Sequence, residues 1–230
     1  MKKLHIARLA ALLALQAAVV SAADRAEDGP DHNCTSWMIF ADLTGNDTNI
    51  LHKNRDANPH DVKVMRSAPD SPRKWIGMGN NNELYMGMNA AGLAACMNSG
   101  EICIEPTVDK SKKRTPMILR SILENCDTAK QAAETMQDFI RRGDYYHGQN
   151  KGSIFFFTDR KEGYICEMTG KFCSVQRYDS GYAFRANIWH NPGMAQRART
   201  PHVKYVETPD AKQWCGRSSM PPSTGNSGST

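Results

Sequence analysis

Three features are missing from this sequence of 230 residues, and each absence argues against a class of protein. No Cys-x2-4-Cys pair occurs, which argues against the common zinc sites. No aromatic residues interleave the one basic cluster, residues 110–114, so a nucleic-acid surface is not expected. The only long apolar run, Leu9 to Val20, is too short to cross a bilayer.

The remaining composition is that of an ordinary globular protein. Hydrophobic residues make up 40% of the chain, charged residues make up 23%, and the formal net charge is +5. These values exclude a disordered chain and a coiled coil, and the length suits one domain with a real core. No internal repeat is present.

The N-terminal segment has the pattern of an export signal. Lys2, Lys3 and Arg8 stand before or at the start of the apolar run, and small residues follow it at Val20-Ser21-Ala22. We expect residues 1–22 to be a removable signal peptide, which predicts a secreted or periplasmic protein; a membrane-anchoring helix is the alternative. Residues 23–33 then form a short acidic propeptide, residues 34–217 the domain, and residues 218–230 a disordered tail or a truncation scar.

Seven cysteines are present, an odd number for a protein whose thiols pair after export. Six residues separate Cys96 from Cys103 and likewise Cys166 from Cys173. Two-residue turns at Ser99-Gly100 and Thr169-Gly170 would place each pair opposite one another, so cross-strand disulfides are one prediction. Buried free thiols are the alternative. Cys34 is left over.

The pattern of residues predicts strands, then helices, then strands again. A hairpin is expected from Trp37 to Asn54, a loop over residues 57–73, and strands over Glu83–Met88 and Gly92–Met97. Pro116 and Thr128 mark the starts of two helices, the second ending at Gly143 with an apolar stripe that should pack on a sheet. Further strands are expected over residues 153–158, 163–168, 172–177 and 182–187. This order predicts an α+β layered domain.

Cys34 carries the chemistry that we expect. If the bond between Asn33 and Cys34 is cut, Cys34 becomes an N-terminal residue with both a thiol and a free α-amine. The ordinary pKa of an α-amine, about 7.7 to 8.0, suits a general base near neutral pH. One residue then supplies nucleophile and base without a neighbouring histidine.

Three stretches of the sequence resemble a known family. They are Cys34-Thr-Ser-Trp with its hairpin to His52-Lys-Asn-Arg-Asp56, then Gly87-Met-Asn-Ala-Ala-Gly-Leu-Ala-Ala-Cys-Met-Asn-Ser-Gly100, then Ala186-Asn-Ile-Trp-His-Asn-Pro192. In this order they resemble the N-terminal nucleophile hydrolases that act on linear amides. The type they resemble is acyl-CoA:6-aminopenicillanic acid acyltransferase, to which the choloylglycine hydrolases and penicillin V acylases are related. The resemblance implies a four-layer αββα sandwich, expected to be incomplete because this chain ends before the second sheet and helix layer are finished.

The resemblance also implies roles for individual residues. Cys34 matches the nucleophile, and Asp56 matches the acidic residue that holds the new α-amine. Lys53 stands where choloylglycine hydrolases have an arginine, so the charge is kept and the planar fork is lost. Asn98 matches a donor to the oxyanion, and Asn187 matches the second amide that positions the substrate or intermediate. A further family arginine has candidates in Arg197, Arg199 and Arg217, and Arg55 and Arg197 are the substrate-binding residues that we expect.

The predicted function is therefore that of an exported amidase or acyltransferase that forms a thioester on Cys34 after autoproteolysis. Its expected partner is a small-molecule amide, with no cofactor, metal or nucleic acid, and with no membrane once the signal peptide is removed; a homo-oligomer is possible. One alternative is a papain-like peptidase with His147 or His190 as the base, although the local Cys-Gly-Ser-Cys-Trp signature is missing. A disulfide-stapled binding module or an inactive homologue is the other alternative.

Overall fold

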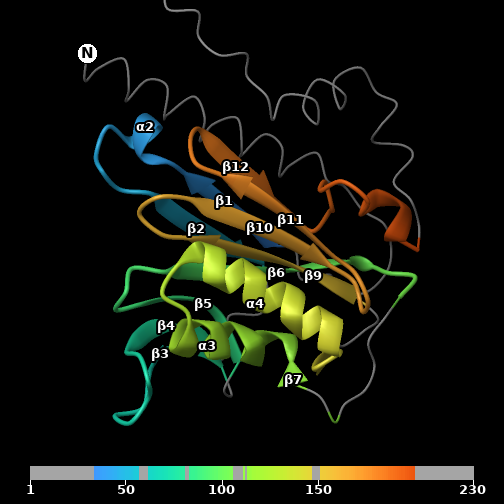
Figure 1. Ribbon diagram of the computed structural model, residues 1–230, viewed down its shortest axis with the longest axis horizontal. Coiled ribbons are helices and arrows are strands. Elements are labelled where there is room, and N and C mark those ends of the chain that lie inside the picture. The colour runs from blue at the N-terminus through green and yellow to red at the C-terminus, as the bar shows by residue number, and fades with distance from the viewer. Residues whose placement is uncertain are drawn as a thin grey trace, which may run out of the picture.

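The computed structural model describes residues 34–56, 62–80, 83–105, 111, 113–146 and 151–199. The predicted signal peptide, the predicted propeptide and the C-terminal tail lie outside these residues, as do His147 and Arg217. Within them the α+β class is confirmed: two longer helices, short helical segments and antiparallel strands form layers (Figure 1).

The predicted N-terminal hairpin is confirmed and belongs to a three-stranded sheet. β1 (Cys34–Ile39) pairs antiparallel with β2 (Ile50–Arg55) and with β12 (Tyr182–Arg185). A short helix, α2 (Ala41–Thr44), and a left-handed Gly45 turn the chain between β1 and β2. Cys34 thus opens a strand that has a neighbour on each side.

A seven-stranded sheet lies against this small one. Its order is β11-β10-β9-β6-β5-β4-β3, and all of its neighbouring pairs are antiparallel. The strands are β3 (Lys63–Arg66), β4 (Trp75–Asn80), β5 (Glu83–Asn89), β6 (Ala94–Ile102), β9 (Lys151–Thr158), β10 (Gly163–Met168) and β11 (Cys173–Tyr178). A two-stranded parallel pair, β7 (Lys113–Arg114) with β8 (Tyr145–Tyr146), and a 3-10 turn (Ala195–Arg197) complete the elements.

Three predictions about these strands are wrong. The loop expected over residues 57–73 contains β3, and β4 follows it unpredicted. Gly77 and Gly79 weaken the strand signal of β4, yet a Cβ on either one would meet a carbonyl oxygen of β5, so the close approach of these strands needs glycine. The turn expected at Ser99-Gly100 is absent, because β6 continues to Ile102 and Gly100 lies beneath the Trp189 ring.

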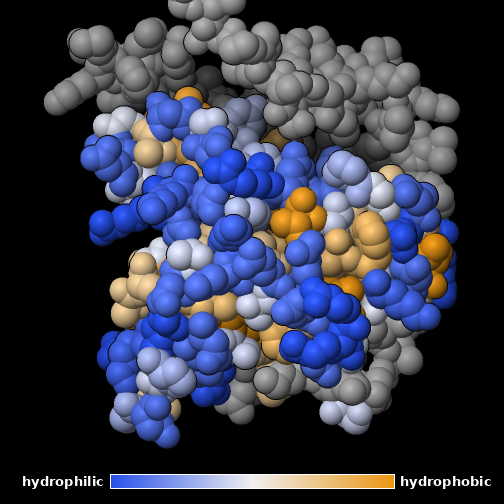
Figure 2. All heavy atoms as spheres, viewed as in Figure 1, coloured by the Kyte–Doolittle hydropathy of each residue, from blue (hydrophilic) through white to orange (hydrophobic). Residues whose placement is uncertain are grey.

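Both predicted helices are present. α3 (Thr115–Asn125) has Pro116 in its first turn, and α4 (Ala129–Arg142) follows the N-cap Thr128, whose hydroxyl accepts from the backbone nitrogen of Gln131 at 3.2 Å. Gly143 ends α4 in the left-handed conformation. The predicted apolar stripe of α4 is buried, and its opposite face is hydrophilic in the view of Figure 2.

Two apolar clusters separate three layers. One lies between α3, α4 and the large sheet, where Phe155 and Phe157 of β9 point toward the helices. The other lies between the two sheets, where Ile154 and Phe156 of the same strand meet Met38 and Phe40. This alternation is what a strand buried on both faces requires. The described residues thus form three layers, α, β and β, of the predicted αββα sandwich.

The cysteine pairing predicted from spacing is wrong in its register. Cys166 lies opposite Val175, and Cys173 lies opposite Met168, since the turn between β10 and β11 has four residues rather than two. Cys96 and Cys103 lie at the two ends of one extended stretch, roughly 23 Å apart at about 3.3 Å per residue, so they cannot be bridged. The thiols of Cys34, Cys96, Cys126, Cys166 and Cys173 are free.

None of the helices in the described residues is long and apolar enough to span a membrane.

Candidate active site

Cys34 lies at the start of β1, opposite Arg55 of β2, and is buried. Its backbone nitrogen donates a hydrogen bond of 2.8 Å to Oδ1 of Asn187. The Asn187 side chain is itself oriented, because its Nδ2 donates to the carbonyl oxygen of Ser99 at 2.7 Å. The nitrogen that would become the α-amine after cleavage therefore already has a fixed acceptor.

Asn98 is the centre of a second group of polar contacts. It precedes Ser99, the residue that orients Asn187, in β6. Its Oδ1 accepts from Ser36 Oγ at 2.7 Å and from Lys53 Nζ at 2.9 Å. Its Nδ2 donates to the carbonyl oxygens of Arg185 at 3.1 Å and Ala186 at 2.9 Å. These four partners fix which end of the amide is the oxygen, because Nδ2 faces two acceptors.

This arrangement gives Asn98 a structural role that sequence reasoning missed. It joins β6, β1, β2 and the chain that leaves β12, and no part of it is exposed. Both of its amide hydrogens are already used. Donation to an oxyanion, the role that the resemblance implies, would require one of the two bonds to backbone carbonyls to break first.

Asp56 is placed differently from the expectation. Its carboxylate is exposed and accepts from Nδ2 of Asn54 at 2.8 Å, whereas the Cys34 nitrogen is held by Asn187. Lys53 is brought into the site: it lies opposite Ser36 in the β1–β2 pair, and both side chains donate to Oδ1 of Asn98. The pKa of the neighbouring His52 is lowered by burial and by the positive charge of Lys53, and its ring stacks on Trp37 with centroids 4.6 Å apart.

The two predicted substrate-binding arginines have different surroundings. The Arg55 guanidinium lies 4.2 Å from the centre of the Tyr85 ring, so it connects the small sheet to β5 beside Cys34. Arg197 is held elsewhere, with Nη1 2.6 Å from Glu105 and its guanidinium over Phe172. None of these partners of Arg197 belongs to the group around Cys34 and Asn98. The structure therefore brings Arg55, and not Arg197, to the site.

The papain-like alternative named His147 and His190, and the one of these that the structure describes, His190, is poorly suited to act as the base. The backbone nitrogen of His190 is bound to Glu167, and partial burial together with the nearby Arg185 lowers the pKa of its imidazole to about 4. A base with so low a pKa is a poor proton acceptor for a thiol at neutral pH. The other candidate, His147, lies outside the described residues.

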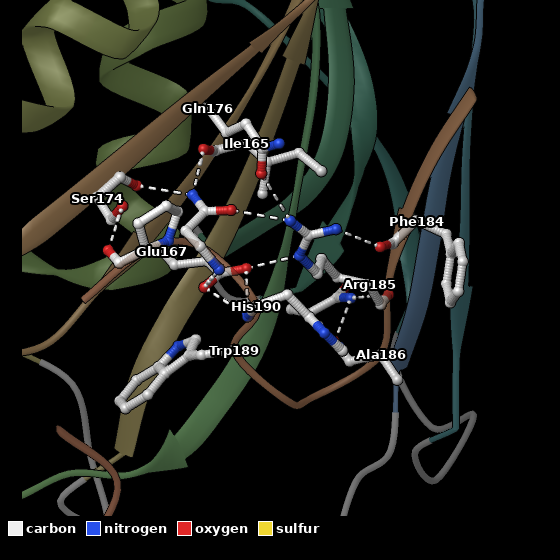
Figure 3. A network of polar contacts seen from close by, with 12 residues as sticks. Ile165, Glu167, Ser174, Gln176, Phe184, Arg185, Ala186, Trp189 and His190 are labelled. Carbon is white, nitrogen blue, oxygen red and sulfur yellow. Dashed lines mark hydrogen bonds and ion pairs between the residues drawn. The ribbon is translucent and has the colours of Figure 1, made fainter. Parts of the chain in front are cut away.

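A buried charged network lies behind the site, and sequence reasoning did not find it (Figure 3). Glu167 of β10 and Arg185 of β12 form an ion pair with Nε 2.6 Å from Oε1, and their side chains are 0% and 9% exposed. Figure 3 shows the Arg185 guanidinium between Glu167 and Gln176 of the neighbouring strand, to which its Nη2 donates at 3.2 Å. One signal was available in the sequence: Glu167 interrupts the otherwise apolar strand around Cys166, and a buried carboxylate requires a partner.

Cys96 is a second thiol close to this site. Burial raises its pKa to about 11, an effect opposed by Lys53 and by a hydrogen bond with Ser36. Its thiol is therefore protonated at neutral pH, and only the thiolate is a good nucleophile. We expect iodoacetamide at neutral pH to leave Cys96 unmodified in the folded protein and to modify it in denaturant. Peptide mapping by mass spectrometry measures this, and rapid labelling of Cys96 in the folded state would contradict it.

Comparison with known proteins supports the family expected from the sequence. The family model described as acyl-coenzyme A:6-aminopenicillanic acid acyl-transferase matches residues 43–205. No curated protein matches the chain.

Three solved structures are similar at low identity. They are a conjugated bile acid hydrolase from Clostridium perfringens (13% identity, TM-score 0.46, covering 65% of this chain and 52% of that chain), penicillin V acylase from Agrobacterium tumefaciens (13%, 0.37, 64% and 42%) and the Caenorhabditis elegans ortholog of N-acylethanolamine-hydrolyzing acid amidase (12%, 0.47, 84% and 88%). This chain therefore spans about half the length of the first two.

Proposed function

Because the chain belongs to the acyl-coenzyme A:6-aminopenicillanic acid acyl-transferase family, we propose that it cleaves linear amides with Cys34 as an N-terminal nucleophile. The observation that carries this proposal is the hydrogen bond from the Cys34 nitrogen to Asn187. Any buried backbone nitrogen requires an acceptor, and at Cys34 an asparagine side chain supplies it. A cysteine whose α-amine is the general base requires one, because the amine must be oriented toward its thiol.

The first step of the proposed reaction uses the two groups of Cys34 together. The sulfur attacks the carbonyl carbon of the amide while the thiol proton passes to the α-amine, and the carbonyl oxygen becomes an oxyanion. The resulting ammonium then donates its proton to the amide nitrogen, the carbon–nitrogen bond breaks, and an amine leaves. The product is a thioester on Cys34.

The second step transfers the acyl group. Water, for hydrolysis, or an amine, for acyl transfer, attacks the thioester carbonyl and gives up a proton to the α-amine as the carbon–sulfur bond breaks. Lys53 contributes a positive charge near these reacting groups, since its Nζ lies 2.9 Å from Asn98 Oδ1, which also binds Ser36. A cation beside a developing negative charge stabilises it more strongly in a buried site than in water.

The same chemistry is proposed to expose the amine. In the uncut chain the Cys34 thiol attacks the carbonyl carbon of Asn33, the peptide bond is replaced by a thioester, and water hydrolyses that thioester. Export through residues 1–22 is part of the proposal, supported by the charged, apolar and small-residue segments described above.

The proposed substrates are linear amides with a carboxylic acyl part and a small amine. Conjugated bile acids, penicillin V and N-acylethanolamines appear in the names of the similar structures, and they provide the three probes. Glycocholate, penicillin V and palmitoylethanolamide are incubated with the purified full chain, and the released amine is measured by mass spectrometry. We expect turnover of at least one of them.

A reagent for the aminothiol unit links this turnover to Cys34. 2-Cyanobenzothiazole forms a stable ring only with a cysteine that has both a free thiol and a free α-amine. We expect one such adduct, on Cys34, and loss of turnover with it. Turnover that survives complete labelling, or an unlabelled chain that cleaves none of the three probes, would contradict the proposed function.

A further inference from the structure

The Glu167 carboxylate binds the first end and the last end of one short loop. Its Oε1 accepts from Arg185 Nε at 2.6 Å, where β12 ends. Its Oε2 accepts from the backbone nitrogens of His190 and Asn191, each at 2.8 Å, where the loop turns back to the sheet. Residues 186–189 between these anchors form a closed loop, and the carboxylate that closes it has no exposed surface.

The two anchors of Glu167 are themselves saturated with hydrogen bonds. Arg185 Nη2 donates to Asn191 Oδ1 at 2.8 Å, so the two ends of the loop are also joined directly. Asn191 Nδ2 donates to the carbonyl oxygens of Ile165 and Ser174, each at 3.0 Å, which fixes the loop to β10 and β11. A buried polar network in which each member is satisfied holds its atoms in one arrangement.

This closed loop carries the parts that orient the nucleophile. Asn187, its second residue, accepts from the Cys34 nitrogen at 2.8 Å. The carbonyl oxygens of Arg185 and Ala186 accept from Asn98, which also binds Ser36 in β1. Displacement of the loop would therefore move the acceptor of the future α-amine while leaving Cys34 itself in its strand.

We propose that Glu167 is a positioning residue for the reaction at Cys34, acting through the closed loop of residues 186–189 and its Asn187. The inference rests on the proposed function, in which the Cys34 nitrogen is the general base. Glu167 touches none of the reacting atoms, and its effect is to hold Asn187 Oδ1 where the amine can donate to it. The charge is essential, because four donor contacts converge on one carboxylate and a neutral amide would turn two of its own hydrogens toward them.

The test compares Glu167→Gln, Asn187→Ala and the double variant in the processed full chain. One readout is the rate of Cys34 alkylation by iodoacetamide as a function of pH. Acceptance by Asn187 Oδ1 stabilises the ammonium form of the amine, so its loss lowers the pKa of the amine. With less positive charge beside it, the thiol deprotonates at higher pH, and the alkylation midpoint moves upward.

If Glu167 acts through Asn187, both single variants shift this midpoint equally, and the double variant shifts it no further. With penicillin V as the substrate, kcat falls by roughly a hundredfold in each, with little change in KM, as expected for a misplaced catalytic group. A Glu167→Gln profile equal to that of the wild type, or effects that add in the double variant, would overturn the proposal.

The matched control is Glu162→Gln, which removes an arginine–glutamate pair at the start of the same hairpin. Glu162 Oε2 lies 2.6 Å from Nε of Arg177, whose side chain is 55% exposed. The Glu162→Gln substitution should leave the alkylation midpoint of Cys34 unchanged. If Glu167→Gln does not fold by circular dichroism, Arg185→Lys replaces it, since the charge stays while the fork to Asn191 is lost. A wild type that alkylates normally but hydrolyses no amide contradicts the proposed function alone, because the alkylation profiles still decide the role of Glu167.

Discussion

Replacement of Cys34 by alanine is expected to leave residues 23–33 attached to the protein, whereas the wild type begins at Cys34. The variant lacks the sulfur that attacks the Asn33 carbonyl, so neither the thioester nor the new amino terminus forms. Where nucleophile and base act as one unit, loss of the nucleophile lowers the reaction rate by about a millionfold. Intact-mass spectrometry of the exported protein measures the two lengths.

Two control variants sharpen this experiment. Cys96→Ala removes the other thiol near the site and should leave cleavage intact, since burial holds the pKa of Cys96 at about 11. Cys173→Ala removes a half-buried thiol of β11 and should also be cut. A wild-type protein that retains residues 23–33, or a Cys34→Ala variant that loses them, would refute self-cleavage.

Replacement of Arg185 by methionine is expected to destabilise the fold by about 3–5 kcal/mol, because it leaves the Glu167 carboxylate buried without its counter-ion. Glu167→Met should have a similar effect, since it strands the guanidinium and the backbone nitrogens of His190 and Asn191. The double variant should lose less than the sum of the two, because no unpaired charge then remains. Guanidinium chloride unfolding, followed by circular dichroism, measures the three values.

Arg177→Met is the control for this series. Arg177 pairs with Glu162 and Asp179, whose side chains are 18% and 56% exposed, so neither carboxylate is fully buried when the pairs are broken. Its unfolding midpoint should remain close to that of the wild type. Additive losses in the double variant of Arg185 and Glu167 would show that the two side chains contribute independently, which would contradict their pairing.

The elements that the sequence predicted well are those whose local signals agree with their tertiary surroundings. Thr128 and Gly143 bound α4 because cap chemistry is local, and the apolar stripe between them fits the sheet. The hairpin from Cys34 was predicted from two apolar runs around a turn, and both strands exist. Cys34, Lys53, Asn98 and Asn187 were named from the resemblance, and hydrogen bonds join them into two neighbouring groups.

The errors arise where a distant contact decides the local structure. β4 was missed because glycine lowers strand propensity, while its use there is the close approach of β5. A turn was predicted at Ser99-Gly100, but Gly100 is needed beneath Trp189, a residue far along the chain. The Glu167–Arg185 pair also joins separate strands, and no spacing rule brings its members together.

The hydrogen bond between Cys34 and Asn187 joins residues 153 positions apart. Cys34 is synthesised 153 residues before Asn187, so a nascent chain carries the Cys34 thiol before the acceptor that orients the Cys34 nitrogen exists. Maturation at this bond would then have to wait until β12 and the loop after it have docked. Removal of the leading peptide would thereby depend on prior docking of the two sheets around Cys34, and a copy in which they have not docked would keep the peptide.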